Sequence, residues 1–323
     1  MNKVLIMGGA GYIGSHTVKY LRSQGYDCIV VDNLSNGVIK AIGDCDFEEA
    51  DLIDIRSLEK IFSKYKIDSV IHFAGLIQVG ESVVNPEKYY QNNVIGTLNL
   101  LSVMKKYNVN KIIFSSSAAV YGNPEYIPID EKHPTHPINP YGMTKLIIEK
   151  VLSDYNKAYG LRYIALRYFN ACGCDRNGEI GEAHKTETHL IPLVLKAITG
   201  EKKNIKIFGD DYDTPDGTCL RDYIHVEDLA VAHKLALEKL DNFSGSINLG
   251  NSNTISVKQI IQSAEQVTQK KCPVKIDKRR DGDPAILYAS NEKAKKILGW
   301  KPKITNIDDI IISAWNWETN RKF

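Results

Sequence analysis

The feature that most constrains the fold is a glycine-rich turn between an apolar run and a segment with helical character. Residues 4–7 read Val-Leu-Ile-Met, and glycines follow at positions 8, 9, 11 and 14. Three spaced glycines alone also suit an ordinary tight turn. In this context, however, they let backbone N–H groups approach a pyrophosphate at a helix N-terminus. The turn therefore predicts a dinucleotide site on a parallel α/β sheet.

A second apolar run, residues 28–31, ends at Asp32, about twenty residues after the turn. A carboxylate at this place accepts hydrogen bonds from the two ribose hydroxyls of adenosine. The alternative reading of Asp32 is a simple turn residue at a strand end. Because an anion there repels a 2'-phosphate, the sequence favours NAD over NADP.

Short apolar runs and helical patterns alternate up to about residue 170, which predicts a doubly wound parallel sheet of the Rossmann type. Beyond that point the pattern is less regular, and we expect a smaller, mixed α/β substrate domain. The expected domains are 1–170 and 171–323, with a return of the chain to the first sheet around 222–250. The expected strands are 3–7, 28–31, 45–48, 69–73, 111–115 and 163–167, and the expected helices are 15–24, 57–65, 87–107, 140–159 and 190–199.

Composition excludes several classes of function. A net charge of +2 gives no electrostatic footprint for nucleic acid, and no stretch approaches the roughly 20 apolar residues of a membrane span. No secretory signal pattern opens the chain, and its six cysteines are scattered, so we expect reduced thiols and a cytoplasmic location. Cys172 and Cys174 form the only close pair and lack nearby partners at ligand spacing, so we expect no metal ion.

A Tyr-x-x-x-Lys pair, Tyr141 and Lys145, begins an expected helix directly after a proline, which places both side chains on one face. A phenol has a pKa near 10, so activation as a base near pH 7 needs roughly 4 kcal/mol of stabilisation from positive charge. Lys145 and an oxidised nicotinamide supply such charge. The same spacing at Tyr107 and Lys111 spans a helix exit, so we do not expect that pair to share a face.

Ser117 lies where the expected strand from residue 111 ends. The carboxyl ends of parallel strands are where open sheets bind ligands, so this hydroxyl is placed to share a substrate proton with Tyr141. Serines at strand ends are also common turn formers. The neighbouring Tyr–Lys pair favours the catalytic interpretation.

The assembled motifs are similar to those of the extended short-chain dehydrogenase/reductase family, and within it most closely to the UDP-glucose 4-epimerases. The resemblance covers essentially the whole chain. It rests on the glycine turn and Asp32 together with Phe-Ala-Gly at 73–75, Asn-Asn at 92–93, Ser115 to Gly122, Tyr141 to Lys145, Arg-Tyr-Phe-Asn at 167–170, Ile-Phe-Gly at 207–209, Asp-Gly-Thr at 216–218, Arg-Asp-Tyr-Ile-His at 221–225 and Arg-Arg-Asp-Gly-Asp at 279–283.

The resemblance implies an isomerase that oxidises C4 of a UDP-hexose, turns the keto sugar and returns the hydride to its other face, with NAD recycled. It implies Tyr141 as base, Lys145 as its modulator and Ser117 as assistant. The NAD contacts implied are Gly8, Gly11, Tyr12, Ile13, Gly14, Asp32, Asn33, Asp51, Leu52, Phe73, Ala74, Gly75, Asn92, Ser115, Tyr141, Lys145 and Tyr168. The substrate contacts implied are Ser117, Tyr141, Asn170, His189, Leu190, Phe208, Arg221, Arg280, Asp283 and Leu287, with both arginines on the diphosphate.

The chain departs from many relatives at three positions, where it carries Ile77 for Lys, His189 for Asn and Leu287 for a bulky Tyr. The smaller Leu287 leads us to expect activity on UDP-N-acetylhexosamines as well. The family also commonly dimerises through the helices that correspond here to 87–107 and 140–159, so we expect a homodimer.

Three other functions compete with this interpretation. A nucleotide-sugar 4,6-dehydratase needs an acid for elimination, and relatives of that type carry an Asp-Glu pair where this chain has Ala118 and Ala119. A UDP-uronic-acid epimerase or decarboxylase is the second alternative, in which cations in the pocket bind the sugar carboxylate. A non-catalytic NAD-binding scaffold would have little reason to keep Ser117, Tyr141 and Lys145 together.

Overall fold

The computed structural model describes residues 3–280 and 282–323. Its centre is a sheet of seven parallel strands in the order β11-β6-β5-β4-β1-β2-β3. From β1, the strands β2 and β3 follow one another toward one edge of the sheet. The strands β4, β5, β6 and β11 follow one another from β1 toward the opposite edge, so the strand order reverses between β1 and β4. Their bounds are β1 Lys3–Met7, β2 Asp27–Asp32, β3 Asp46–Glu49, β4 Ser69–His72, β5 Lys111–Ser117, β6 Arg162–Tyr168 and β11 Gly245–Leu249.

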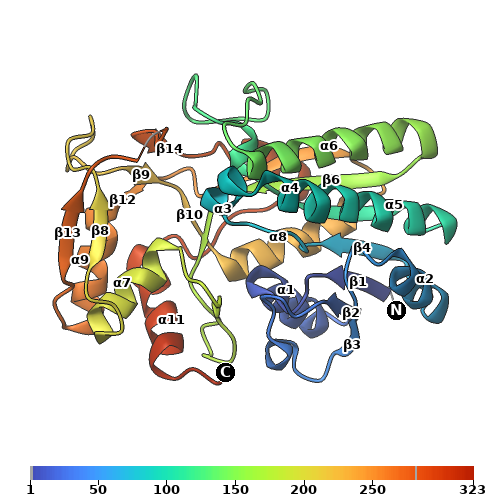
Figure 1. Cartoon of the computed structure of the whole chain (residues 1–323), viewed down its shortest axis with the longest axis horizontal. Helices are drawn as coiled ribbons and strands as arrows, with labels where there is room; N and C mark the ends of the chain where they lie inside the picture. The colour runs from blue at the N-terminus through green and yellow to red at the C-terminus, as the bar shows by residue number, and fades with distance from the viewer. Residues whose placement is uncertain (1–2, 281) are drawn as a thin grey trace.

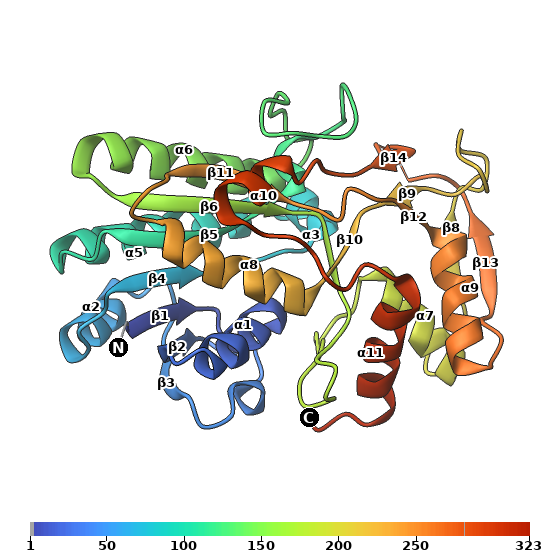
Figure 2. The ribbon, with the colours of Figure 1, turned by 180° about the vertical axis from the view of Figure 1, so that it is seen from behind.

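Helices cover both faces of this sheet (Figures 1 and 2), so its central strands β1, β4 and β5 are buried over almost their whole length. In β1, Val4 and Ile6 join one buried cluster, while Leu5 and Met7 join the other. The first cluster is closed by α1 (Tyr12–Ser23), α8 (Val226–Lys239) and α10 (Glu292–Leu298), and the second by α2 (Ile55–Lys64), α5 (Gly96–Lys106) and α6 (Pro140–Tyr159).

The C-terminal part has its own core, formed by three helices and short sheets. Trp317, one of its largest fully buried side chains, lies in α11. The helices are α7 (Leu190–Thr199), α9 (Val257–Thr268) and α11 (Ile307–Thr319), and the strands are β7 Asn170–Cys172, β8 Ile205–Phe208, β9 Leu220–Arg221, β10 Tyr223–His225, β12 Ile255–Ser256, β13 Val274–Asp277 and β14 Ile286–Leu287. Figure 1 shows this part beside the large sheet, with the C-terminus close to the segment that precedes α7.

The structure confirms the predicted doubly wound sheet, and β11 lies at one edge of it. The division at residue 170 stays a prediction. The helix predicted over 87–107 is wrong as a single α-helix, since α4 (Pro86–Tyr89) passes through a π-helical segment, Tyr90–Ile95, into α5. A π segment adds a residue to the turn, which periodicity alone does not register, and such segments are frequent at functional sites. A short helix, α3 (Val79–Val84), was not predicted.

Candidate active site

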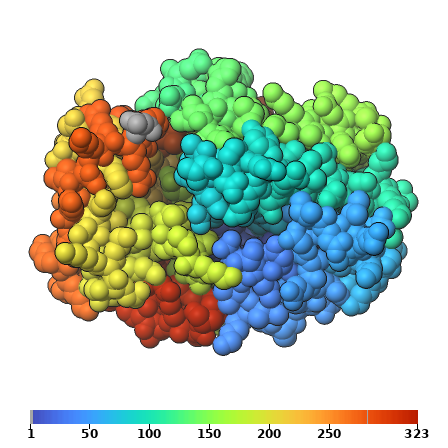
Figure 3. All heavy atoms as spheres, viewed as in Figure 1, coloured from blue at the N-terminus to red at the C-terminus, as the bar shows by residue number. Residues whose placement is uncertain are grey.

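A cavity of about 550 Å³ lies at the carboxyl ends of the strands, where the strand order reverses. This is the general ligand site of open parallel sheets. All the residues that the sequence assigned to NAD line it, from Gly8 in the first turn to Tyr168 in β6. Of the residues assigned to substrate, Ser117, Tyr141, Asn170 and His189 line it as well. Figure 3 shows the hollow between the N-terminal residues in blue, the cyan residues near 90 and the yellow-green residues near 185.

The glycine turn has the shape that a pyrophosphate requires. Gly8 has φ +75°, and a Cβ there would lie 2.5 Å from the backbone nitrogen of Ala74. A Cβ at Gly14 would lie 2.3 Å from the carbonyl oxygen of Gly8. The N-cap of α1 is Gly11, which has no side chain to accept from the first N–H groups of the helix. These donors and the helix dipole are left to an anionic ligand.

Asp32 lies at the end of β2 with only 8% of its surface exposed. Its Oδ2 accepts from the backbone N–H of Ala10 at 3.1 Å and its Oδ1 from that of Leu34 at 2.9 Å. Burial raises the pKa of this carboxyl, and the two backbone hydrogen bonds oppose that rise. A Cβ at Gly37 would lie 2.8 Å from Oδ1, so only glycine leaves the approach to the carboxylate open. The turn, the uncapped helix and this carboxylate together fit NAD.

Lys145 is buried one turn after Tyr141 on α6, whose start is capped by Asn139. Its Nζ donates to the carbonyl oxygen of Ser115 at 2.7 Å and lies 5.8 Å from the centre of the Tyr141 ring. Burial lowers the pKa of Lys145 to about 8, with the charge of Glu149 acting in the other direction. The lysine is therefore held beside the phenol without a direct bond to its hydroxyl.

Burial raises the pKa of Tyr141, and a hydrogen bond with Ser117 partly counters that rise. The residues of the cavity therefore do not by themselves supply the charge that activates the phenol. The sequence predicted that Lys145 and nicotinamide together stabilise the phenolate of Tyr141. We now expect the positive ring of the cofactor to supply the larger part of that stabilisation. Tyr107 is the C-cap that follows α5 and Lys111 begins β5, so the second Tyr–Lys pair shares no helical face, as predicted.

Two residues of the site were missed as individual functional residues. Asn93, in the π-helical segment, is buried and holds the loop after β4, since its Oδ1 accepts from Leu76 N at 2.8 Å and its Nδ2 donates to Leu76 O at 3.1 Å. His184 lines the cavity and faces the carboxylates of Glu182 and Glu187. The sequence signal for His184 was the run Glu-x-His-x-x-Glu-x-His at 182–189.

The remaining substrate candidates lie outside the lining of the cavity. Arg221 pairs with Asp283, and β14 places Leu287 beside Arg221. The guanidinium of Arg280 stacks 3.9 Å from the centre of the Phe208 ring. The last candidate, Leu190, starts α7. The motif residue Asp281 lies outside the described residues.

A parallel sheet with a phosphate-binding turn, an acidic residue on β2 and a buried Tyr–Lys pair defines the class of NAD-dependent enzymes of the extended short-chain dehydrogenase/reductase type. A family model described as the NAD dependent epimerase/dehydratase family matches residues 4–250. The chain belongs to this family.

Known proteins resemble the chain over nearly its whole length. It is 54% identical to a UDP-glucose 4-epimerase of Halalkalibacterium halodurans over 97% of this chain and 95% of the relative. A UDP-glucose 4-epimerase structure from Brucella ovis in complex with NAD has a TM-score of 0.95 and 50% identity, and covers 98% of each chain. The UDP-Glc/GlcNAc 4-epimerase structure of Campylobacter jejuni has a TM-score of 0.88 and 40% identity, and covers 99% of each chain.

These comparisons confirm the predicted fold, family and NAD dependence. None of the described helices is long and apolar enough to cross a membrane. All six cysteines are free in the structure.

Proposed function

We propose that this protein interconverts UDP-galactose and UDP-glucose by inverting C4 of the sugar, with NAD recycled in each turnover. The prediction of an isomerase that acts on C4 of a UDP-hexose is confirmed by the full-length likeness to UDP-glucose 4-epimerases. The roles of the individual residues are inferred from one observation: Ser117, Tyr141 and Lys145 lie together on one wall of the NAD cavity.

In the proposed reaction Tyr141 takes the proton of the C4 hydroxyl and later returns a proton to the C4 oxygen. NAD held by the glycine turn and Asp32 would supply the acceptor, and then the donor, of the hydride at C4. Ser117 hydrogen-bonds to Tyr141 and shares the moving proton, while Lys145 keeps positive charge near the phenolate.

The site lacks the acid that a dehydratase needs. Ala118 and Ala119 form the 3-10 turn directly after β5, and Ser117 Oγ accepts from the backbone N–H of Ala119 at 3.1 Å. With no carboxylate in this turn, elimination of water has no proton donor. Epimerisation is therefore favoured over dehydration.

We also propose that UDP-N-acetylhexosamines are substrates. Leu287 packs on a small cluster that contains Val120, three residues after Ser117, and Leu146, the residue after Lys145. The side chain at 287 thus lies close to the catalytic elements. A leucine there leaves more room than a tyrosine for an N-acetyl group, and the likeness to a UDP-Glc/GlcNAc 4-epimerase supports the same range.

The other proposed contacts place the UDP-sugar between the cavity and the C-terminal part. Arg221 and Arg280 are assigned to the diphosphate, where guanidinium geometry suits phosphate oxygens. Phe208 is assigned to uracil, and Asn170, Asp283 and the start of α7 at Leu190 to the remaining polar groups. In the structure the two arginines already have partners, Asp283 and Phe208, so substrate binding has to compete with these contacts.

We propose a homodimer formed through α5 and α6. Met143, Ile147 and Val151 lie four residues apart on α6 and remain half-exposed, and Ile95 before α5 is 42% exposed. We further propose a cytoplasmic location, which the six free cysteines support. Sedimentation of the wild type and of Ile147→Asp tests the dimer, which the variant is expected to dissociate.

The function is tested by incubating the purified protein with UDP-galactose, UDP-N-acetylgalactosamine and UDP-glucuronate, with no added cofactor. We expect UDP-glucose and UDP-N-acetylglucosamine as products and no change in UDP-glucuronate. Conversion without added NAD is expected because the cofactor is retained and recycled. Failure to form UDP-glucose with or without NAD would contradict the proposal, and turnover of UDP-glucuronate would favour a uronic-acid enzyme.

A further inference from the structure

Four side chains with metal-binding groups converge at one wall of the cavity. Glu182, His184, Glu187 and His189 each direct one ligand atom to a common point, and these atoms all lie within 4.8 Å of one another. Nδ1 of His189 lies 2.6 Å from Oε1 of Glu182 and 3.1 Å from Oε1 of Glu187. Nδ1 of His184 lies 3.1 Å and 3.6 Å from oxygens of the same two carboxylates.

Among the described residues, the only basic side chains that contact the two carboxylates of this cluster are the imidazoles of His184 and His189. Only 4% of the Glu182 side chain and 7% of the Glu187 side chain are exposed. Within residues 3–280 and 282–323, neither carboxylate forms an ion pair with a lysine or an arginine. The nearest lysine in sequence, Lys185, instead donates to the carbonyl oxygen of Ser35. Burying two carboxylates this way is costly unless cations replace the lost water.

An independent observation points to a ligand. Oε1 of Glu182 is buried and has no aligned hydrogen-bond donor in the part of the chain that the structure describes, although both imidazoles are close to it. Buried polar atoms are nearly always satisfied, so a buried oxygen whose two neighbouring imidazole nitrogens are misaligned for hydrogen bonds points to an ion as its partner.

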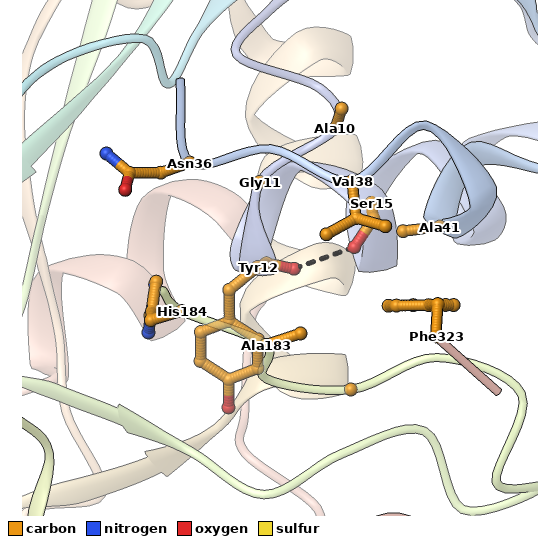
Figure 4. A pocket seen from close by; sticks show the side chains of 11 residues that line it. Ala10, Gly11, Tyr12, Ser15, Asn36, Val38, Ala41, Ala183, His184 and Phe323 are labelled. Atoms are coloured by element: carbon orange, nitrogen blue, oxygen red, sulfur yellow. Dashed lines mark hydrogen bonds between the residues drawn. The ribbon is translucent and has the colours of Figure 1, made fainter. Parts of the chain in front are cut away.

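The ligand atoms are held in place by contacts of their own. The carbonyl oxygen of Glu182 accepts from Nε1 of Trp317 at 3.0 Å. Oε1 of Glu187 accepts from the backbone N–H groups of Thr188 and His189, each at 2.7 Å. The ring of His184 stands edge-on to Tyr12 at the start of α1, and Figure 4 shows these two side chains next to each other. Carboxylates that bind metal ions are commonly hydrogen-bonded in the way that Glu187 is.

We propose that Glu182, His184, Glu187 and His189 bind one divalent transition-metal ion of the zinc class. Two neutral imidazoles and two carboxylates balance a charge of +2, and nitrogen and oxygen ligands in fourfold coordination suit Zn²⁺. Tetrahedral bonds of about 2.0–2.1 Å separate ligand atoms by about 3.3 Å, within the range of separations here. The ion is structural, because it cross-links four side chains within one stretch, residues 182–189, that has no helix or strand of its own. This assignment replaces the expectation of a metal-free protein.

The test is zinc binding by the full-length, tag-free protein after dialysis against a chelator. We expect one Zn²⁺ per chain in a competition titration with a chromogenic chelator. In Glu187→Gln, the amide oxygen still accepts from the two backbone N–H groups, but a charged ligand is lost, so affinity should fall at least about 100-fold. The matched control is Glu179→Gln in the same segment, where the carboxylate is 54% exposed and pairs with Lys19.

A second measurement separates binding at this cluster from binding elsewhere. Lys185 is exposed inside the segment, so trypsin cleavage after it reports how firmly the segment is held. Zinc should slow this cleavage at least tenfold in the wild type and in Glu179→Gln, but not in Glu187→Gln. Absence of a bound equivalent, or equal zinc affinity in both variants, would overturn the proposal. Sulfur ligands in the X-ray absorption spectrum would also do so, because they would assign the ion to cysteines.

Discussion

The cavity has two unlike walls. One is formed by the carboxyl ends of parallel strands, which the hydrogen-bond ladder of the large sheet holds in place. The other is the segment 173–189, which has no helix or strand and is held by individual side chains such as Trp317. A wall built on a ladder positions NAD and catalytic groups with little tolerance for movement, whereas a wall held by side chains can vary with the substrate. The comparison therefore predicts that chemistry and cofactor binding depend on the first wall, and substrate choice on the C-terminal part.

The largest effect is expected from Tyr141→Phe on the sheet wall. Removal of the hydroxyl removes the proposed base, and such groups contribute about 10²–10⁴-fold to rates. We expect kcat for UDP-galactose to fall by about 10³-fold while NAD stays bound, as measured by steady-state kinetics and by the absorbance of cofactor released on denaturation. The matched control is Tyr107→Phe, the tyrosine of the second Tyr–Lys pair, which should keep full activity. Equal values of kcat in the two variants would contradict the assignment of Tyr141 as the base.

The next effect is expected from Asp32→Asn. The amide has only one oxygen, so it cannot replace a carboxylate that already accepts from two backbone N–H groups and still binds ribose hydroxyls. Hydrogen bonds to charged groups contribute about 1.5–3 kcal/mol, which corresponds to roughly 10- to 100-fold in NAD affinity. Calorimetric titration of the NAD-free protein measures this loss. Asp44→Asn, at an exposed carboxylate paired with Arg22, should bind NAD like the wild type.

A smaller effect, on stability, is expected from Lys145→Met. Burial lowers the pKa of this lysine from 10.5 to about 8 in the folded protein, so the buried charge costs about 3 kcal/mol at pH 7. Between pH 8 and 10.5 the unfolded chain binds more protons, and the lysine's contribution to the unfolding free energy rises with pH. After subtraction of about 1 kcal/mol for the hydrogen bond to Ser115, the NAD-free variant should be about 2 kcal/mol more stable than the wild type at pH 7.

Urea unfolding at pH 7 and at pH 9.5 checks this expectation. The advantage of Lys145→Met over the wild type should shrink at the higher pH, because the wild-type lysine then loses its proton in the folded state. Activity should be lost at both values. An advantage that does not change with pH would show that packing, and not buried charge, determines the stability of this wall.

The two walls also differ in how well the sequence predicted them. The strand Lys3–Met7 and the helix Pro140–Tyr159 were placed at the observed bounds, because their apolar periods and end signals are local. The NAD contacts that the family resemblance implies all line one cavity as well. The π-helical segment at Tyr90–Ile95 was missed because one added residue hardly changes the apolar pattern.

The irregular wall was harder to predict for a physical reason. His189 was considered alone as a contact of the diphosphate, whereas the structure turns its Nδ1 toward Glu182 and Glu187. That arrangement depends on the turn of the segment and on the contact of Glu182 with Trp317, more than 130 residues later in the chain. The contacts of Arg221 with Asp283 and of Arg280 with Phe208 also join residues more than 60 positions apart. Local sequence patterns do not contain this information.

The smallest effect is expected from Leu287→Tyr, which tests the C-terminal side of the comparison. Leu287 packs beside Leu146 and Val120, so a larger ring there should narrow the space for an N-acetyl group and leave a plain hexose less affected. Pocket changes of this size alter discrimination by about 1–3 kcal/mol, and we expect kcat/KM for UDP-N-acetylgalactosamine to fall about tenfold relative to that for UDP-galactose. Leu287→Met, which keeps the volume, should preserve the ratio. The variant leaves the sheet wall untouched, so the amount of retained NAD should not change. An equal fall in kcat/KM for both substrates would contradict the view that substrate choice depends on the C-terminal part alone.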